Sequence, residues 1–322
     1  MAVDIIHRRT SPSTQLSFLT NTLSSVSSIR RISILVHGWG CQATHFIPLI
    51  ARLTANGENA DHGYLYLAVD LPGHGESPAS ILPEPENGGM TELIVALICE
   101  VLHQQIYDHA PSGDKKRQSI PTVLYGHSMG TLVALELLMA LQDHSLMEVS
   151  HLVLLDAAWT GEQTAEPLNY NDLRKTAIKY RESIQEQLSQ YFGPRTSLEF
   201  ESTTRAGFAG LDFEYALRMG HWYRGVEAKA AQTLQNLDAK NRLLLGSGDK
   251  PVRILIVQSQ EAHGPDGRHS LVSGQSTAHM LFVRRHLASE WTQELVIEGT
   301  SHYPHVDDVD EVVECLAKFF SQ

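Results

Sequence analysis

The chain of 322 residues contains few cysteines and has a deficit of basic residues. Its three cysteines, Cys41, Cys99 and Cys315, are far apart and odd in number, so we expect no disulfide framework and a reducing compartment. The 25 Lys and Arg residues are outnumbered by 37 Asp and Glu residues, which gives a formal net charge of -12. Because this charge repels a phosphate backbone and an anionic membrane surface, we expect neither nucleic acid nor a membrane as a partner.

The sequence also lacks a continuous apolar run of about 20 residues, the length that spans a bilayer. It has no internal repeat and no low-complexity tail. No group of histidine, cysteine or acidic residues has a metal-ligand spacing that we recognise, and no glycine-rich loop fits a phosphate. We therefore expect a cytoplasmic protein that acts on a small molecule without a metal or other cofactor, and the sequence leaves its oligomeric state open.

Strand-like and helix-like segments alternate over most of the chain. This alternation predicts an α/β protein with a mostly parallel sheet and helices on both faces. "DIIHRR" and "TQLSFLT", separated by the turn-forming "TSPS", predict an opening hairpin. The strands expected after it begin at Arg31, Tyr64, Ile120, His151, Pro251 and Thr292.

The alternation is interrupted after Trp159, and no strand-like run follows until residue 251. We expect an α/β core formed by residues 1–158 and 251–322, with a helical cap insertion at 159–250. One helix of this insertion is expected from its apolar positions, which recur every three or four residues. These positions are Leu173, Ala177, Tyr180, Ile184, Leu188 and Tyr191.

A serine lies between two glycines in "GHSMG" at 126–130, where a strand-like run changes into a helix-like one. A serine that attacks from such a turn must adopt a strained backbone, so its neighbours two residues away must be nearly free of side chain. In this arrangement the hydroxyl of Ser128 is exposed, and the backbone N–H of Met129 can point at a developing oxyanion from a helix N-terminus. We predict that Ser128 is a nucleophile.

"HGWG" at 37–40 follows the expected strand that begins at Arg31. An oxyanion needs a second backbone donor, which in this architecture comes from the loop after that strand. The N–H of Trp39 is the candidate, and we expect His37 and Trp39 to line the pocket. A simpler interpretation is that His37 and Gly38 only end the strand, because glycine is common at such turns.

A base is expected in "GTSHYPHVDD" at 299–308, between the last strand and the last helix. A serine hydroxyl needs a base to attack, and a histidine on a loop at the same edge of the sheet supplies one. The chain has 17 histidines, and His305 lies only three residues further on. We favour His302, because it alone directly follows the Gly-Thr-Ser that ends the strand and precedes Tyr-Pro.

The ordered motifs "HGWG", "DLPGHGES", "GHSMG" and "SHYPHVDD" resemble the signatures of the α/β-hydrolase superfamily. The resemblance covers most of the chain except about 160–250, which is similar to the variable cap that such enzymes place over the active site. It implies the α/β-hydrolase fold and a Ser-His-acid triad. It names no substrate, because one fold hosts many reactions.

The acid of this triad is open at the level of sequence. Most relatives carry it after the penultimate strand, where this chain has Glu261 near the usual place and Asp266 further along. Asp156, which ends "HLVLLD", is the other candidate, although an aspartate there often only caps the next segment. Whichever residue serves must reach the second nitrogen of the histidine from the end of a strand.

"HGW", "LLDAAW", "QSQEA" and "SHYPHVDDVDE" also resemble the cofactor-independent 2,4-dioxygenases of 3-hydroxy-4-quinolones, which share this fold. That family places its acid after the same strand as Asp156, which makes Asp156 the favoured acid. Its histidine deprotonates a substrate hydroxyl, the resulting carbanion reacts with dioxygen, and the serine is auxiliary. The extra histidines typical of that family are replaced here by Gly40, Cys41 and Met129.

Three functions remain after these comparisons. The favoured one is a hydrolase that acts on an ester, lactone or similar carbonyl of a small, largely apolar metabolite. The alternatives are ring cleavage of the dioxygenase type, or another non-hydrolytic conversion with His302 as the base, and a ligand-binding protein on the same fold. The presence of a nucleophile, a base and oxyanion donors together argues against a pure binding protein.

Overall fold

The computed structural model describes residues 6–21, 29–55, 63–81, 90–107, 119–141, 147–157, 159, 175, 188–211, 213–247, 250–260 and 271–321. Within them, eight strands form one sheet in the order β1-β2-β4-β3-β5-β6-β7-β8. They are β1 Ile6–Thr10, β2 Ser17–Asn21, β3 Arg31–Val36, β4 Tyr64–Val69, β5 Ile120–His127, β6 Met147–Leu155, β7 Arg253–Gln260 and β8 Thr292–Glu298. The opening hairpin is β1 and β2; β2 also pairs antiparallel with β4, and the remaining neighbours are parallel.

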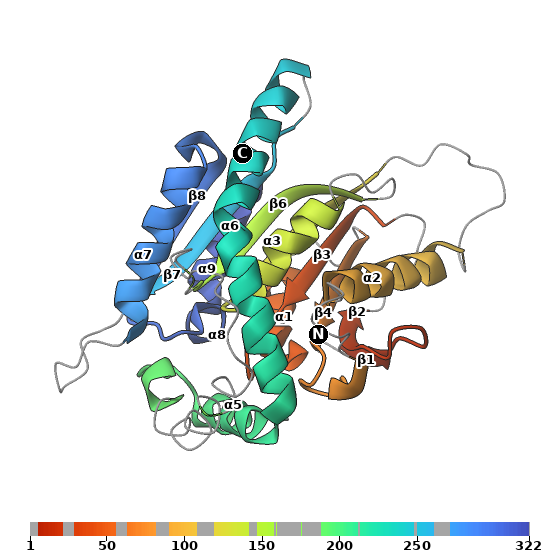
Figure 1. Cartoon of the computed structure of the whole chain (residues 1–322), viewed down its shortest axis with the longest axis vertical. Coiled ribbons are helices and arrows are strands. Elements are labelled where there is room, and N and C mark those ends of the chain that lie inside the picture. The colour runs from red at the N-terminus through yellow and green to blue at the C-terminus, as the bar shows by residue number, and fades with distance from the viewer. Residues whose placement is uncertain are drawn as a thin grey trace.

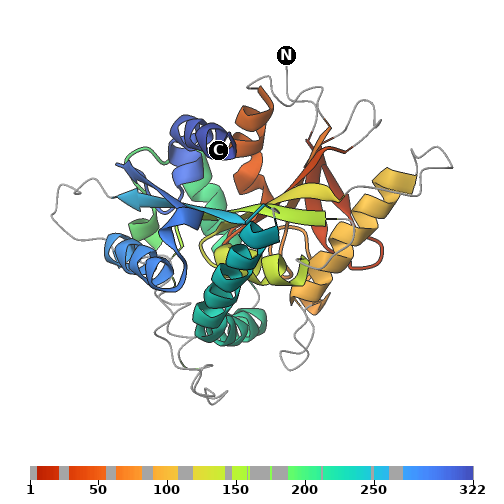
Figure 2. The same ribbon diagram turned by 90° about the horizontal axis from the view of Figure 1, so that it is seen from above.

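Two layers of helices cover the sheet (Figure 1). The helices are α1 Ile47–Ala55, α2 Met90–Tyr107, α3 Gly130–Leu141, α5 Leu198–Gly210, α6 Phe213–Ser247, α7 Leu271–His286, α8 Pro304–Asp307 and α9 Val309–Phe320, with short 3-10 turns at η1 Ala43–Phe46, η2 Ala79–Ile81, η4 Ser189–Tyr191 and η5 Ser289–Trp291. Seen from above, α1 and α9 lie on one face of the sheet, and α2, α3, α6 and α7 lie on the other (Figure 2). The prediction of a mostly parallel sheet with helices on both faces is confirmed.

The central strands bury side chains on both faces, as their nearly continuous apolar sequences require. In β3, Ile34 and Val36 join the apolar core that contains α3 and α6, whereas Leu35 joins the core that contains α1 and α9. All three side chains are fully buried. Strands β3 and β5 therefore form a firmly packed platform, and the loops that carry the expected site begin at their carboxyl ends.

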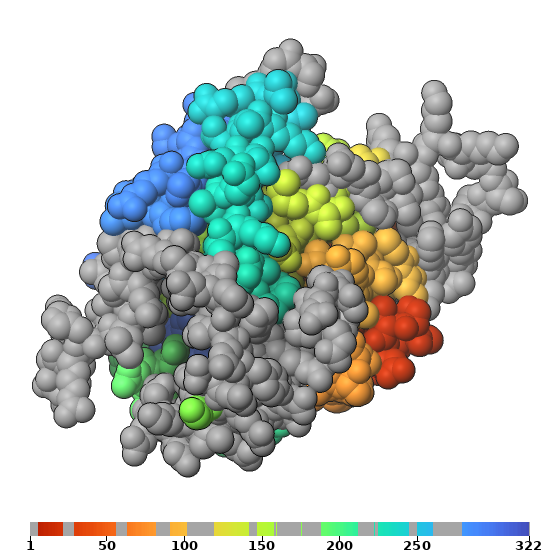
Figure 3. All heavy atoms as spheres, viewed as in Figure 1, coloured from red at the N-terminus to blue at the C-terminus, as the bar shows by residue number. Residues whose placement is uncertain are grey.

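Helix α6 occupies much of the segment that was expected to form a cap. Its buried apolar residues Val226, Ala230, Leu234 and Leu237 recur every three or four positions and join the core on the α3 face of the sheet. The helix packs against α3 and α7, and Figure 3 shows it crossing the surface beside them. This part of 159–250 thus lies in the helical layer of the sheet, while most of the helix face expected between Leu173 and Tyr191 falls outside the described residues.

Candidate active site

Ser128 lies in the sharp turn between β5 and α3, with a positive φ of 51°. This left-handed conformation is strained for a residue that carries a side chain. The flanking glycines permit it: a Cβ on Gly126 would lie 2.4 Å from the carbonyl oxygen of Gly130, and a Cβ on Gly130 would lie 2.3 Å from the carbonyl oxygen of Val36. The side chain of Ser128 stays half-buried at the carboxyl edge of the sheet, at the start of α3.

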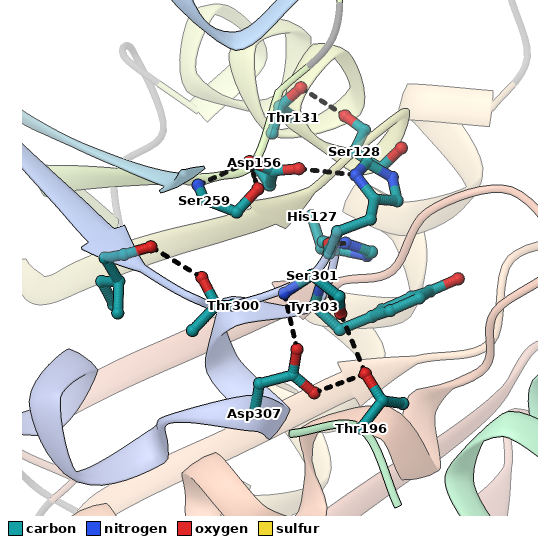
Figure 4. A network of polar contacts seen from close by, with 12 residues as sticks. His127, Ser128, Thr131, Asp156, Thr196, Ser259, Thr300, Ser301, Tyr303 and Asp307 are labelled. Carbon is teal, nitrogen blue, oxygen red and sulfur yellow. Dashed lines mark hydrogen bonds and ion pairs between the residues drawn. The ribbon is translucent and has the colours of Figure 1, made fainter. Parts of the chain in front are cut away.

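His302 and Asp156 are in direct contact although 146 positions separate them in the sequence. The imidazole Nδ1 of His302 lies 2.6 Å from the carboxylate Oδ2 of Asp156 (Figure 4). Because a carboxylate accepts and does not donate, Nδ1 carries the proton and Nε2 is left as the basic nitrogen. Of the three acids that the sequence left open, Asp156 is thus the one brought to His302; Glu261 and Asp266 lie outside the described residues.

Asp156 is oriented by Ser259 at the end of β7. The other carboxylate oxygen, Oδ1, accepts a hydrogen bond from the Ser259 backbone N–H at 2.8 Å and another from its hydroxyl at 2.7 Å. Asp156 is 1% exposed and has a positive φ of 45°. Sequence analysis missed Ser259, although a serine that closely follows the apolar run Ile254 to Val257 at the carboxyl end of a strand is a usable signal.

Replacing Ser259 by alanine should lower turnover by about tenfold, because a hydrogen bond to a charged group contributes about 1.5 kcal/mol or more. The backbone N–H of residue 259 still donates in this variant, so the loss stays partial. The measurement is kcat on the best available ester. Ser259→Thr, which keeps a hydroxyl, is the matched control; equal turnover in all three proteins contradicts an orienting role for the hydroxyl.

The loop that carries His302 is fixed by hydrogen bonds from two consecutive backbone N–H groups. The Ser301 backbone N–H donates to the carboxylate of Asp307 at 2.7 Å, and the His302 backbone N–H donates to the carbonyl oxygen of Tyr191 at 3.3 Å. Gly299, with a φ of 72°, turns the chain out of β8. His302 is 7% exposed, so most of its surface is covered by the surrounding protein.

The "HGWG" loop packs directly against the turn that carries Ser128. A Cβ on Gly38 would lie 2.8 Å from the Cβ of Ser128, so no larger residue fits there without displacing one of the two loops. The half-buried Trp39 follows Gly38, and Met129, which follows Ser128, is 3% exposed. The two residues expected to supply oxyanion donors therefore each adjoin one side of this contact.

His37 is buried between two loops. Its Nε2 accepts a hydrogen bond from the Leu71 backbone N–H at 3.0 Å, and its Nδ1 lies 2.7 Å from the carbonyl oxygen of Gly38. Burial lowers the pKa of His37 to about 3, so the ring is neutral. Since the side chain is 0% exposed and both nitrogens contact the backbone, we assign His37 to loop positioning in place of the expected contact with substrate.

Asp70, in the loop after β4, helps to hold the loop after β3 in place. Its carboxylate is fully buried, accepts from the Ala43 backbone N–H at 2.6 Å and pairs with Arg8 of β1. His74 of the loop after β4 accepts from the Gly40 backbone N–H at 3.0 Å, and burial lowers its pKa to about 3. The "DLPGHGES" motif thus supports the conformation of the "HGWG" loop.

Part of the segment at 188–211 covers these loops. A Cβ on Gly40 would meet the ring of Phe208 in α5 at 2.3 Å, and one on Gly207 would lie 2.5 Å from the Gly40 carbonyl oxygen. A Cβ on Gly193 would lie 3.1 Å from the Ser301 side chain. Residues of this segment therefore contact both the loop after β3 and the loop after β8.

The described residues include no group of three or more His, Cys, Asp or Glu side chains arranged to hold a metal ion. None of the described helices is both long and apolar enough to cross a membrane.

Three kinds of comparison place this architecture among known proteins. A search of curated proteins found no match. Solved structures with similar folds include the epoxide hydrolase CorEH (14% identity, TM-score 0.55, 98% of each chain covered) and the enol-lactonase from Burkholderia xenovorans LB400 (13% identity, TM-score 0.58, 98% of this chain and 100% of that chain). A serine hydrolase from the polyaromatic hydrocarbon-degrading bacterium Cycloclasticus zankles is similar as well, with 14% identity, a TM-score of 0.60 and coverage of 98% and 97%.

Because these identities are low, the structural likeness shows the fold alone. It confirms the α/β-hydrolase fold expected from the motifs. The family model described as "Alpha/beta hydrolase family" matches residues 34–315, nearly the whole chain. The matched range begins in β3, ends in α9 and includes Ser128, Asp156 and His302. The chain therefore belongs to the alpha/beta hydrolase family.

Proposed function

We propose that this protein hydrolyses an ester or lactone carbonyl of a small, largely apolar metabolite through Ser128, His302 and Asp156. The observation that carries the proposal is the 2.6 Å contact between His302 Nδ1 and Asp156 Oδ2, at the sheet edge where Ser128 occupies its strained turn. This contact assigns the basic nitrogen of His302 to Nε2. Family membership and hydrolases among the structural relatives support the same reaction class.

The first half of the reaction forms an acyl-enzyme. The Ser128 hydroxyl loses its proton to His302 Nε2 while its oxygen bonds to the carbonyl carbon. The charge that develops on the carbonyl oxygen is stabilised by the N–H groups of Trp39 and Met129, and Asp156 stabilises the imidazolium. The tetrahedral intermediate then expels the alcohol, which takes the proton from His302.

In the second half, water replaces the alcohol. His302 takes a proton from the water molecule as its oxygen attacks the acyl carbon, and collapse of the new intermediate returns the proton to Ser128 and releases the carboxylic acid. Trp39 is half-buried and directly follows Gly38, which packs against Ser128; its indole supports an apolar acyl or alkyl group in the substrate.

The decisive experiment is covalent trapping of Ser128. Wild-type protein incubated with a short-chain p-nitrophenyl ester and quenched in acid should show the acyl mass increment on the peptide that contains Ser128. Ser128→Ala should show no increment and no hydrolysis, and His302→Ala should show neither at a measurable rate, because the hydroxyl is then without its base.

A second assay separates the alternatives. If Ser128→Ala keeps most turnover on a 3-hydroxy-4-quinolone with oxygen uptake, while His302→Ala loses it, covalent hydrolysis is wrong and His302 is the base of an oxygen-dependent reaction. If the ligand binds unchanged in both variants and neither wild type nor variant converts it, the protein is a binding protein.

A further inference from the structure

A second histidine lies at the nucleophile turn and has no part in the proposed proton transfers. His127 directly precedes Ser128 at the end of β5 and is 1% exposed. Its Nε2 lies 2.7 Å from the backbone carbonyl oxygen of His302. Because a carbonyl oxygen only accepts hydrogen bonds, Nε2 carries the proton and donates it to this carbonyl.

The surroundings of His127 keep its ring neutral. Its ring centroid lies 4.9 Å from that of His302, 4.7 Å from that of His305 and 5.1 Å from that of Tyr303. Burial, followed by the neighbouring imidazoles of His305, His302 and His45, lowers the pKa of His127 well below its usual value. The Nδ1 of His127 has no hydrogen-bond partner in the described part of the chain. The bond from Nε2 to His302 is therefore the one hydrogen bond that the ring makes there.

This bond acts on the backbone of the proposed base. The His302 N–H is held by the Tyr191 carbonyl at 3.3 Å, and His127 holds the carbonyl on the other side of the same residue. The direction of the imidazole from its Cα depends on these two peptide groups. A displacement of about 1 Å at a reacting group can lower the rate by 10²-fold. Loss of the hydrogen bond from His127 is therefore expected to affect turnover.

We propose that His127 is a positioning residue that ties the base loop to the nucleophile turn through its hydrogen bond to the His302 carbonyl. The proposal rests on the proposed function, in which Ser128 and His302 react together. The bond joins the residue next to the nucleophile to the base itself. A movement of the turn therefore carries the base with it, and the separation of Ser128 and His302 is preserved.

Two substitutions of similar length isolate the hydrogen bond. His127→Gln places an amide nitrogen where the imidazole Nε2 lies, whereas His127→Met fills a similar volume without a donor. In His127→Met we expect kcat to fall by about 10- to 100-fold with KM unchanged, because binding does not require the aligned base. His127→Gln should recover most of this loss.

A spectroscopic measurement separates this role from a purely structural one. The proton shared by His302 Nδ1 and Asp156 should give a low-field NMR resonance in the wild type, keep its position in His127→Gln, and shift or broaden in His127→Met. If the methionine variant unfolds, His127→Asn, whose amide is too short to reach the carbonyl, replaces it. A donor-free variant that keeps both kcat and the resonance overturns the proposal.

Failure of the proposed function gives a different result. If the wild type forms no acyl-enzyme at Ser128, hydrolysis is wrong, yet the resonance still reports whether His127 orients His302. If the wild type is acylated and His127→Met is acylated at the same rate with an unchanged resonance, hydrolysis stands and the positioning role is wrong.

Discussion

Replacing Asp156 by asparagine should lower kcat by about 10⁴-fold, the cost seen when a catalytic triad keeps its geometry but loses the charge of its acid. The amide can present its NH₂ group to Nδ1, which favours the tautomer with the proton on Nε2 and removes the base. The amide also lacks the negative charge that stabilises the imidazolium. The hydrogen bonds from Ser259 to Oδ1 can be kept by the amide oxygen, so the expected loss is in turnover and not in folding.

The matched control is Glu261→Gln. It removes one negative charge in the same way, at the acid that lies near the position used by most relatives. We expect it to leave kcat within a few-fold of wild type. Steady-state kinetics on one ester and the melting temperatures of both variants complete the measurement. A large loss in Glu261→Gln with near-normal turnover in Asp156→Asn would assign the acid to Glu261.

Mild acid should destabilise the folded chain strongly. Burial lowers the pKa of His37, His74 and His305 to about 3 and that of His45 and His279 to about 4. An unfolded chain binds protons on these imidazoles near pH 6.5, whereas the folded chain does so only near pH 3 to 4. The free energy of unfolding therefore falls as pH falls below about 6.5, by about 1.4 kcal/mol per pH unit for each such histidine.

Two histidines that behave in this way lower the free energy of unfolding by about 4 kcal/mol between pH 6.5 and pH 5. This is a large part of the stability of a typical domain. Urea unfolding at a series of pH values measures the slope. His305→Leu should reduce the slope by about one proton, because both ring nitrogens of His305 are buried without a hydrogen-bond partner in the described part of the chain. His7→Gln on exposed β1 is the control; a slope unchanged by both substitutions shows that His305 does not contribute.

The fold was predictable because its signals are local. Apolar runs and turn residues mark each strand, and their alternation with helical spacing implies parallel pairing. The starts of β3, β4, β5 and β8 agree with the runs that begin at Arg31, Tyr64, Ile120 and Thr292. The position of α6 in the helical layer was not predictable, because an amphipathic helix shows which face is buried without showing against what it packs.

The residues of the candidate site were likewise predictable where their signals are local and not where they depend on distant contacts. Ser128 and His302 are marked by short motifs, because a strained turn and a strand end impose requirements on their immediate neighbours. Asp156 was favoured over Glu261 only through the second resemblance, because the contact that supports it joins segments 146 positions apart, which local sequence cannot report. The contact of Ser259 with Asp156 likewise depends on the pairing of β6 with β7. The contact of His127 with His302 depends on the approach of the loop after β8 to the end of β5.

Gly126 and Gly130 are each packed against main-chain atoms: Gly126 lies against the backbone of Gly130 and Thr131, and Gly130 lies against the backbone of Val36 and His37. The turn that carries Ser128 is therefore located largely by main-chain atoms, which are the same for any amino-acid sequence with these glycines. Mutational drift in the surrounding core changes side chains and leaves this contact in place. Substitutions in the covering segment at 188–211 leave this main-chain contact unchanged as well, so the covering segment and the turn that carries Ser128 can evolve largely independently.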